Sequence, residues 1–319
     1  MDQPLIILAG PTGAGKSALS VDLAGRFSGE IVNCDSLQLY RGFDIGTAKT
    51  PVHARRGIPH HLFDVLEPWE GSSAGEYARI ARAAIAEISA RGRLPAVAGG
   101  TGFYLRALLE GLPALPVQDR DLRARLAARE EKRPGALHRL LSRLDPEAAL
   151  RIHARDTQKL IRAMEVRILT GSPPPPRSAA EPLRGYRVLK IGLDPDRAQL
   201  FARLDARVCT MFSSGLIEEV RALLAGGATG NEKPFESLGY KQALAYIRGS
   251  CSLDQAIELA QLQTRQYAKR QWTWFRRDTE MSWLRGFGDD PAVRQQCLAQ
   301  VERFLDSPAP GGAAALETR

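Results

Sequence analysis

The stretch Gly10-Pro11-Thr12-Gly13-Ala14-Gly15-Lys16-Ser17 has the pattern G-x-x-x-x-G-K-[ST] of a phosphate-binding loop. It stands between an apolar run at residues 5–9 and a helix-like segment at residues 18–23, which predicts a strand before the loop and a helix after it. In such a loop the backbone N–H groups point at phosphate oxygens, the lysine adds a positive charge and the serine hydroxyl can ligate Mg²⁺. The motif therefore predicts a phosphate site. Alone it is typical of ATP-binding proteins, and it does not define which molecule carries the phosphates.

Strand-like and helix-like segments alternate around this loop. Apolar, β-branched residues predict strands at residues 31–34 and 94–98, and an alanine-rich segment at residues 74–90 predicts a helix between them. We also expect a strand at residues 62–65, after His60 and His61, with a structural role for both histidines. This alternation predicts an α/β fold of the P-loop NTPase type, a parallel sheet flanked by helices, with ligands at the carboxyl ends of the strands.

The pattern changes after residue 113, where only helices are predicted as far as residue 170. Asp145 and Asp156 stand where helix N-caps are expected, and Pro146 follows at a first helical position. A strand at residues 188–193 then returns to the core, followed by a helix from Asp194-Pro195, a long helix at residues 253–277 and a last strand at 281–284. We therefore expect a catalytic core at residues 1–113 and 188–307, a helical insertion at 114–187 that ends in the stiff proline linker 172–176, and a disordered tail at 308–319.

Charge and cysteine usage limit the class of protein. The 319 residues carry a net charge of +8, and residues 114–187 contain 16 Lys and Arg against 9 Asp and Glu. This surplus favours a polyanionic partner, with a solvated arginine-rich surface as the alternative. The four cysteines are scattered without a C-x-x-C pair, no apolar run reaches about 20 residues, and the first strand leaves no room for a signal peptide. We expect a cytoplasmic monomer without membrane contact.

Two polar residues follow predicted strands and are expected at the same edge of the sheet. Asp35 follows the strand at 31–34, where it could bind Mg²⁺ or act as a general base, with a turn cap as the alternative. Thr101 lies within Gly99-Gly100-Thr101-Gly102, where its hydroxyl suits a phosphate or a metal-bound water. No predicted strand ends in the aspartate that an ATPase would use as its second Mg²⁺ ligand, which counts against nucleotide hydrolysis.

Taken in order, these stretches resemble the bacterial tRNA dimethylallyltransferase (tRNA isopentenyltransferase) family over about residues 5–285. The resemblance lies in the phosphate loop and in Asp35-Ser36-Leu37-Gln38-Leu39-Tyr40, Asp44-Ile45-Gly46-Thr47-Ala48-Lys49, Pro59-His60-His61-Leu62, Gly99-Gly100-Thr101-Gly102-Phe103-Tyr104, Asp156-Thr157-Gln158-Lys159-Leu160-Ile161-Arg162 and Thr264-Arg265-Gln266-Tyr267-Ala268-Lys269-Arg270-Gln271-Trp272-Thr273-Trp274-Phe275-Arg276. Such enzymes transfer a dimethylallyl group from dimethylallyl diphosphate to N6 of the adenine at position 37, beside the tRNA anticodon. The resemblance implies that the phosphate loop holds a diphosphate leaving group rather than ATP.

The resemblance also implies a role for each candidate residue. Asp35 is the expected general base, and Lys16, Mg²⁺ and an arginine neutralise the leaving diphosphate; we choose Arg207 for that arginine, with Arg203 as runner-up. Ser17 and Thr101 are the expected Mg²⁺ ligands or partners of its waters. The adenine would flip out of the anticodon loop to reach Asp35. Expected tRNA contacts in the core are Asp35, Ser36, Leu37, Gln38 and Thr101, and those in the insertion are Arg123, Gln158, Lys159, Leu160, Ile161 and Arg162.

Two other functions use part of the same pattern. A P-loop kinase would place ATP in the loop and use Asp35 to activate a hydroxyl of a nucleoside or small metabolite. A non-enzymatic RNA-binding regulator would use a nucleotide as a switch. The kinase leaves the basic insertion unexplained, and the regulator gives Asp35 and Thr101 no task.

Overall fold

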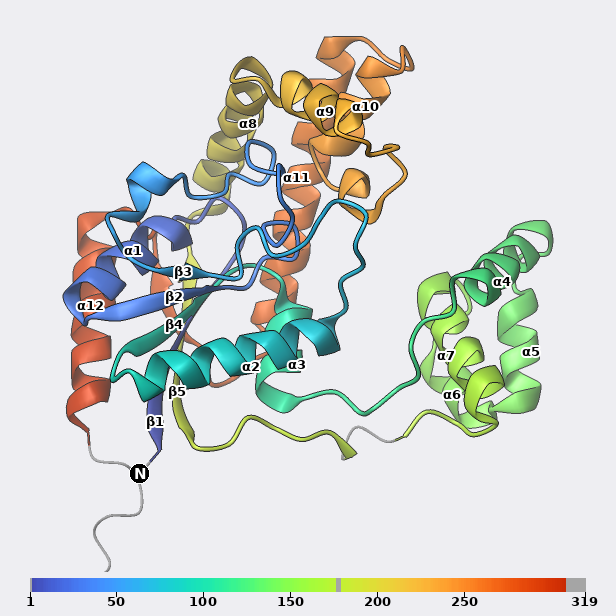
Figure 1. Ribbon diagram of the computed structural model, residues 1–319, viewed down its shortest axis with the longest axis horizontal. Helices are drawn as coiled ribbons and strands as arrows, with labels where there is room; N and C mark the ends of the chain where they lie inside the picture. The colour runs from blue at the N-terminus through green and yellow to red at the C-terminus, as the bar shows by residue number, and fades with distance from the viewer. Residues whose placement is uncertain (1, 176–178, 308–319) are drawn as a thin grey trace, which may run out of the picture. The chain divides into compact units, whose positions relative to one another are not determined.

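The computed structural model of the protein describes residues 2–175 and 179–307, and within them the chain divides into two units (Figure 1). The core unit comprises the described residues of Met1–Leu109 and Leu183–Arg319, and the helical unit comprises those of Glu110–Pro182. Leu183 N donates to Leu109 O at 2.8 Å, so the helical unit leaves and re-enters the core at one point. The expected boundaries were 113/114 and 187/188. The predicted tail, and Pro176 of the predicted linker, lie outside the described residues.

A parallel sheet of six strands forms the centre of the core unit. The order is β3-β2-β4-β1-β5-β6, with bounds β1 Gln3–Ala9, β2 Gly29–Asn33, β3 His60–His61, β4 Leu94–Ala98, β5 Tyr186–Asp194 and β6 Ser282–Arg285. The central strand β1 pairs on both sides, with Ile6 opposite Ala96 and Leu189. Both of its faces are covered, which explains its continuous apolar run of residues 5–9, each at most 1% exposed. The predicted parallel α/β fold is confirmed.

Helices cover both faces of this sheet. The connection from β1 to β2 and that from β3 to β4 run in opposite directions along the sheet, so right-handed crossovers place α1 (Lys16–Arg26) and α2 (Ala74–Ala90) on opposite faces. The helix α12 (Pro291–Asp306) packs on the same face as α1, where the side chains of both helices share one apolar cluster with β1. The short helix α3 (Gly102–Glu110) follows β4.

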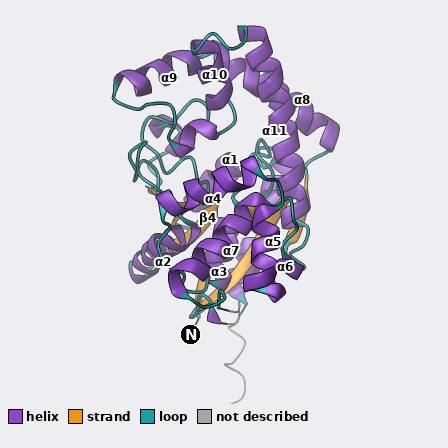
Figure 2. Cartoon of the chain, turned by 90° about the vertical axis from the view of Figure 1, so that its right-hand side faces the viewer, coloured by secondary structure: helices purple, strands orange, loops and turns teal. Residues whose placement is uncertain are grey.

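The remaining core helices gather beyond the carboxyl ends of the strands (Figures 1 and 2). These are α8 Arg197–Ser213, α9 Leu216–Ala225, α10 Tyr240–Ile247 and α11 Leu253–Phe275, with the 3₁₀ helices η1 Val52–Arg55 and η3 Lys233–Glu236 in the connecting segments. They enclose the edge of the sheet at which ligands of parallel α/β proteins bind.

The predicted strand at residues 62–65 is wrong. The strand β3 consists of His60 and His61, after which Leu62 and Asp64 adopt positive φ values of 63° and 57°. Polar anchors hold this turn, because Asn33 Nδ2 donates to Leu62 O at 3.0 Å and Lys49 Nζ donates to the Asp64 carboxylate at 2.6 Å. These polar contacts outweigh the preference of the apolar side chains at residues 62–65 for a strand. Both histidines do have a structural role: His60 Nδ1 contacts Ile58 O, and His61 Nε2 contacts the Glu30 carboxylate at 2.6 Å.

The predicted helix start at Asp194-Pro195 is two residues too early. Asp194 is the last residue of β5, and its carboxylate accepts from Trp272 Nε1 at 2.9 Å. Asp196 caps α8 instead, by accepting from Gln199 N at 3.0 Å. The shift matters because it sets which side chains of α8 face the carboxyl ends of the strands.

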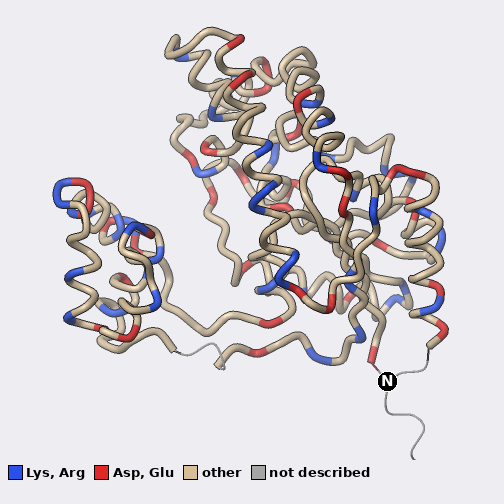
Figure 3. Tube along the Cα trace, turned by 180° about the vertical axis from the view of Figure 1, so that it is seen from behind, with Lys and Arg blue, Asp and Glu red and all other residues tan. Residues whose placement is uncertain are grey.

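The helical unit contains α4 Arg120–Lys132, α5 Ala136–Leu144, α6 Pro146–Arg151 and α7 Thr157–Thr170. The predicted caps are confirmed, since Asp145 accepts from Ala148 N and Asp156 from Lys159 N. Lys and Arg recur along these helices, with Asp and Glu between them (Figure 3). Leu160 and Ile161 are 0% and 7% exposed, with their side chains in the apolar core of this unit, so any contact of these positions with tRNA would have to involve the main chain.

Glu165 organises the polar part of this unit. It is fully buried, and its carboxylate accepts from Asp119 N at 2.7 Å, Arg123 Nη1 at 3.1 Å and Arg162 Nη1 at 2.5 Å. Arg162 also donates to Pro116 O at 2.9 Å. The guanidinium groups of Arg123 and Arg162, which the sequence suggested as tRNA contacts, thus hold the helices together.

Replacing Glu165 with glutamine is expected to lower the free energy of unfolding of the helical unit by about 3 kcal/mol, since two arginines lose their shared counter-charge. The loss should lie at the lower end of the range for buried pairs, because both arginines keep about a quarter of their side-chain surface exposed. Urea unfolding followed by far-UV circular dichroism measures it. The matched control is Glu147→Gln, which removes an exposed pair with Arg151 and should cost less than about 0.5 kcal/mol. Equal losses in the two variants would contradict the role given to Glu165.

Candidate active site

The phosphate loop lies between β1 and α1, as its sequence context predicts. Gly10, Gly13 and Gly15 have φ values of 141°, 79° and 87°, which other residues rarely adopt. Lys16 Nζ donates to Gly10 O at 2.9 Å and to Pro11 O at 2.7 Å, so the ammonium group folds back over the loop. The loop therefore has the curled shape of a phosphate-binding loop, with its lysine held against it.

Distant segments enclose this loop. A Cβ atom on Gly13 would come within 2.7 Å of the Leu204 side chain on α8, and one on Gly15 within 2.6 Å of Asp289 Oδ1. Gly288 N donates to Ala14 O at 2.8 Å. The glycines are thus needed for contact with α8 and with residues 288–289, as well as for backbone curvature.

Asp35 and Thr101 lie together at the carboxyl ends of β2 and β4. Asp35 Oδ1 accepts from Leu37 N at 2.9 Å, so the expected alternative of a turn cap is also met. Thr101 Oγ1 accepts from Ser36 N at 3.2 Å, and Thr101 N donates to Cys34 O at 3.1 Å. The two strand ends that the sequence paired are therefore joined by direct hydrogen bonds.

The glycines around Thr101 allow close packing within the protein. A Cβ atom on Gly99 would clash with the Cys34 backbone, one on Gly100 with the Gln271 side chain, and one on Gly102 with the Trp274 ring. The turn is packed against protein on these sides, and Trp272 is a core residue.

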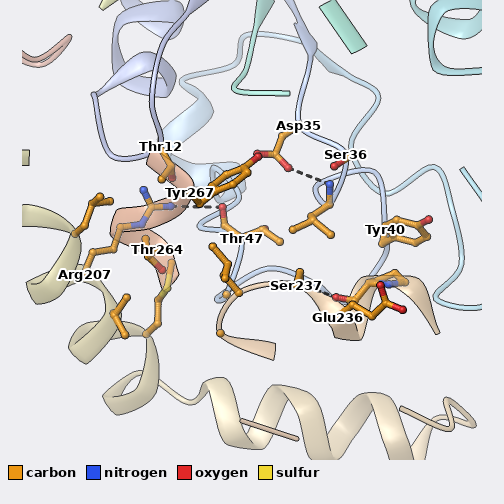
Figure 4. Close-up of a pocket in the computed structure, with 18 of the residues that line it drawn as sticks. Thr12, Asp35, Ser36, Tyr40, Thr47, Arg207, Glu236, Ser237, Thr264 and Tyr267 are labelled. Carbon is orange, nitrogen blue, oxygen red and sulfur yellow. Dashed lines mark hydrogen bonds between the residues drawn. The ribbon is translucent and has the colours of Figure 1, made fainter. Parts of the chain in front are cut away.

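A cavity of about 510 Å³ opens in front of these residues (Figure 4). Its wall carries the polar residues Thr12, Asp35 and Arg207. The helix α8, which bears Arg207, also contributes the apolar side chains of Leu204, Val208, Met211 and Phe212. Such a wall suits a ligand that has a charged part and a hydrocarbon part.

The structure separates Arg207 from Arg203. Arg207 lines the cavity and its Nη2 donates to Thr47 O at 3.5 Å (Figure 4). Arg203 turns away and forms two bonds of 2.9 Å with the Asp289 carboxylate, with its guanidinium over the Phe287 ring. Burial lowers the pKa of Arg207, while the Asp35 charge raises it and the Arg203 charge lowers it. The geometry thus favours Arg207 over Arg203 as a cation of the cavity, whose wall also includes Lys233 and Arg270.

Lys16 shares an electrostatic environment with Asp35 and Arg207. Burial lowers the pKa of Lys16 to about 8; the Asp35 carboxylate opposes this shift, and the Arg207 guanidinium adds to it. The ammonium form binds anions, so a bound diphosphate should raise this pKa. The affinity of the loop for phosphates then depends on pH near neutrality.

We expect the dissociation constant of inorganic pyrophosphate to rise roughly tenfold per pH unit once the pH exceeds the Lys16 pKa of about 8. The dissociation constant rises, rather than falls, because the free protein loses the Lys16 proton above that pH, whereas the complex retains it. Isothermal titration calorimetry between about pH 7 and pH 9.5 measures the effect. Lys16→Arg is the control, because its guanidinium does not titrate in this range. At each pH, the dissociation constant of the wild type is divided by that of Lys16→Arg. The protonation of pyrophosphate itself cancels in this ratio, so the remaining change with pH is due to Lys16. A constant ratio would contradict the prediction.

The donor set at this site fits Mg²⁺. Among the residues that the structure describes, no group of three or more His, Cys, Asp or Glu side chains could hold a metal ion. The exposed hydroxyl of Ser17 and the hydroxyl of Thr101 offer few, hard oxygen ligands at the phosphate site. Mg²⁺ commonly keeps several waters and binds through few protein groups together with substrate phosphates, so this sparse set suits it.

Sequence reasoning missed three contributors to the site. Tyr267 lines the cavity beside Asp35, and burial raises its pKa well above the ordinary value (Figure 4). Thr47 bonds to Arg207 through its carbonyl oxygen. Gln271 contacts the phosphate loop from α11. Tyr267 and Gln271 are four residues apart on one helix, a spacing that could have placed them on the same face.

The parallel sheet and the phosphate loop define a P-loop-like protein, and its cavity has charged and apolar residues in one wall. The family model for IPP transferase matches residues 38–278, and the chain belongs to this family. It is 59% identical to a tRNA dimethylallyltransferase of Solibacter usitatus, over 95% of this chain and 99% of that protein, and 53% identical to one of Koribacter versatilis with the same coverage.

Two solved structures are similar to this chain in sequence and in fold. The tRNA isopentenylpyrophosphate transferase of Bacillus halodurans is 36% identical, with a TM-score of 0.69 and coverage of 95% of both chains. A eukaryotic dimethylallyltransferase that acts on tRNA is 28% identical, with a TM-score of 0.81 and coverage of 97% of this chain and 81% of the other.

Proposed function

We propose that this enzyme transfers the dimethylallyl group of dimethylallyl diphosphate to N6 of the adenine at position 37 of tRNA and releases diphosphate. The observation that carries the proposal is the cavity, whose wall combines Asp35 and Arg207 with apolar side chains of α8. A short prenyl diphosphate has this division into a charged and a hydrocarbon part. The relatives named as tRNA dimethylallyltransferases, which match nearly the whole chain, speak for the transferase and against the kinase.

The donor would lie with its diphosphate in the phosphate loop and its hydrocarbon against Leu204, Val208 and Met211. The leaving group gains negative charge as the bond between oxygen and C1 of the prenyl group breaks. Lys16 and Arg207 are placed to neutralise that charge, and fixed cations in a partly desolvated site are usually the largest contribution to such a step. Ser17 and Thr101 would hold Mg²⁺, which supplies further positive charge to the phosphates when bound.

The acceptor needs a base because the lone pair of its N6 is delocalised into the adenine ring. Asp35 would accept the N6 proton as the bond from N6 to C1 of the prenyl group forms and the bond from C1 to the diphosphate oxygen breaks. The base has to leave the anticodon-loop stack first, at a cost of a few kcal/mol. Ser36, Leu37 and Gln38 lie next to Asp35 and are our candidates for contacts with the flipped adenine.

The helical unit would bind the anticodon stem-loop. Gln158 and Lys159 are exposed in the first turn of α7, where Lys159 pairs with Asp156. Arg123 and Arg162 pair with Glu165 and keep about a quarter of their side-chain surface exposed. All four remain our candidates for tRNA contacts. Phosphate contacts imply an affinity that falls with salt. None of the helices in the described part of the chain is long and apolar enough to cross a membrane. We place the reaction in the cytoplasm, where the four free thiols would stay reduced, and expect a monomer.

The test is transfer of label from radiolabelled dimethylallyl diphosphate to unmodified tRNA, with Mg²⁺ and purified protein. We expect label in the tRNA, and none when guanine replaces adenine at position 37. A parallel reaction supplies labelled ATP and nucleosides. Phosphorylated nucleoside without label in tRNA would replace this function with that of a kinase.

A further inference from the structure

The side chain of Gln271 lies on α11, at the junction between the phosphate loop and the turn that carries Thr101. The residue is 5% exposed, and both ends of its amide are used. Gln271 Oε1 accepts from Thr12 N at 2.8 Å, and Gln271 Nε2 donates to Gly100 O at 2.9 Å. A main-chain N–H can only donate and a carbonyl oxygen can only accept, so the orientation of the amide follows from its partners.

The packing around this amide is close. A Cβ atom on Gly100 would lie 2.3 Å from Gln271 Nε2, so glycine is required there for the amide to reach the carbonyl oxygen. Thr12 lines the cavity, but its N–H points at Gln271 and is thereby taken out of the set of donors available to a phosphate. This amide is the only described side chain that bonds to both segments.

We propose that Gln271 is a positioning residue that fixes the phosphate loop relative to Thr101, and thus the leaving diphosphate relative to the transferred carbon. The proposal rests on the transferase function proposed above. The two segments come from different strands, β1 and β4, and each bears groups of the reaction: Lys16 on one and Thr101 on the other. A displacement of about 1 Å between such segments can cost a hundredfold in rate.

Two variants remove this link in different ways. Gln271→Met keeps the size of the side chain but leaves Thr12 N–H and Gly100 O without partners. Gln271→Glu keeps the acceptor for Thr12 N–H. When the introduced carboxyl is ionised, one of its oxygens repels Gly100 O. When it is protonated, it donates to Gly100 O as the amide does. At about pH 8 we expect both variants to lose roughly ten- to a hundredfold in kcat with little change in KM for tRNA.

The pH dependence separates positioning from general damage. Relative to the wild type at each pH, Gln271→Glu is expected to regain at least about fivefold in kcat between about pH 8 and pH 6, as the introduced carboxyl takes up a proton. The ratio for Gln271→Met should stay constant. Because the other groups of the active site are the same in all three proteins, the ratios remove their contribution to the pH dependence. Gln295→Glu, an exposed change of the same charge on α12, is the matched control and should match the wild type.

Hydrogen exchange gives a readout that does not depend on activity. Amide exchange across residues 10–17 should be faster in Gln271→Met than in the wild type, and the dissociation constant of pyrophosphate with Mg²⁺ should rise about three- to tenfold. A folded Gln271→Met variant with wild-type exchange and kcat would overturn the proposal, as would a Gln271→Glu ratio that is independent of pH. If the wild type transfers no label while exchange and pyrophosphate binding respond to the variants, the link stands and the proposed function fails.

Discussion

Replacement of Asp35 with asparagine is expected to lower kcat for transfer to tRNA by about 10²- to 10⁴-fold, the usual contribution of a general base. Asparagine has the same shape, and its Oδ1 can still accept from Leu37 N, so the turn at the end of β2 should persist. What it loses is the ability to take the N6 proton. Single-turnover transfer with saturating donor and tRNA measures the effect, and tRNA affinity should change by less than about threefold.

The matched control is Asp196→Asn. Asp196 also accepts from one main-chain N–H, that of Gln199, at the start of α8, and asparagine is an equally good helix cap. This variant should keep full activity. If Asp35→Asn retained more than about a tenth of the wild-type rate, the base would have to be sought elsewhere in the cavity.

Arg207→Gln is expected to lower kcat/KM for dimethylallyl diphosphate by roughly 10²- to 10³-fold, as removal of one fixed donor to a developing anion does. Arg207 lines the cavity and lies in the electrostatic environment of Lys16 and Asp35, so its loss leaves Lys16 as the chief protein cation near the phosphates. Arg207→Lys should recover part of the loss through its charge alone.

Arg203→Gln provides the comparison, because Arg203 stands four residues earlier on the same helix and pairs with Asp289 at the surface. The side chains of this pair are 40% and 43% exposed, so we expect less than about a threefold change in kcat/KM. Rates measured over a range of donor concentrations test both variants. The opposite order of effects would assign the diphosphate to Arg203.

The sequence predicted the parts of the site that depend on local pattern. The loop at residues 10–17 and the polar residues Asp35 and Thr101 follow buried strands, and parallel strands bring such residues to one edge. Their spatial neighbours could not be predicted in this way. Whether Arg203 or Arg207 faces the cavity depends on the rotation of α8, which is set by the cap at Asp196 and by contacts with residues 288–289.

The errors have a common physical origin. Leu62 and Asp64 leave the extended conformation because a buried lysine and Asn33 hold them, and neither partner is near in sequence. Nothing in the sequence pattern likewise indicates that Arg123 and Arg162 bind a buried glutamate, although their contact with tRNA stays a prediction. In each case a long-range polar contact decides the outcome, and periodicity carries no information about such contacts.

The hydrogen bond between Leu183 N and Leu109 O has a consequence for how this protein can change over evolutionary time. The helical unit begins and ends at adjacent points of the core. The two ends of the core chain at Leu109 and Leu183 are therefore held together almost as a tight turn would hold them. Insertions, deletions or sequence drift within residues 110–182 can then occur without shifting β4 or β5. Under the function proposed above, RNA selectivity would then be free to diverge in one unit without a change to the chemistry of transfer in the other.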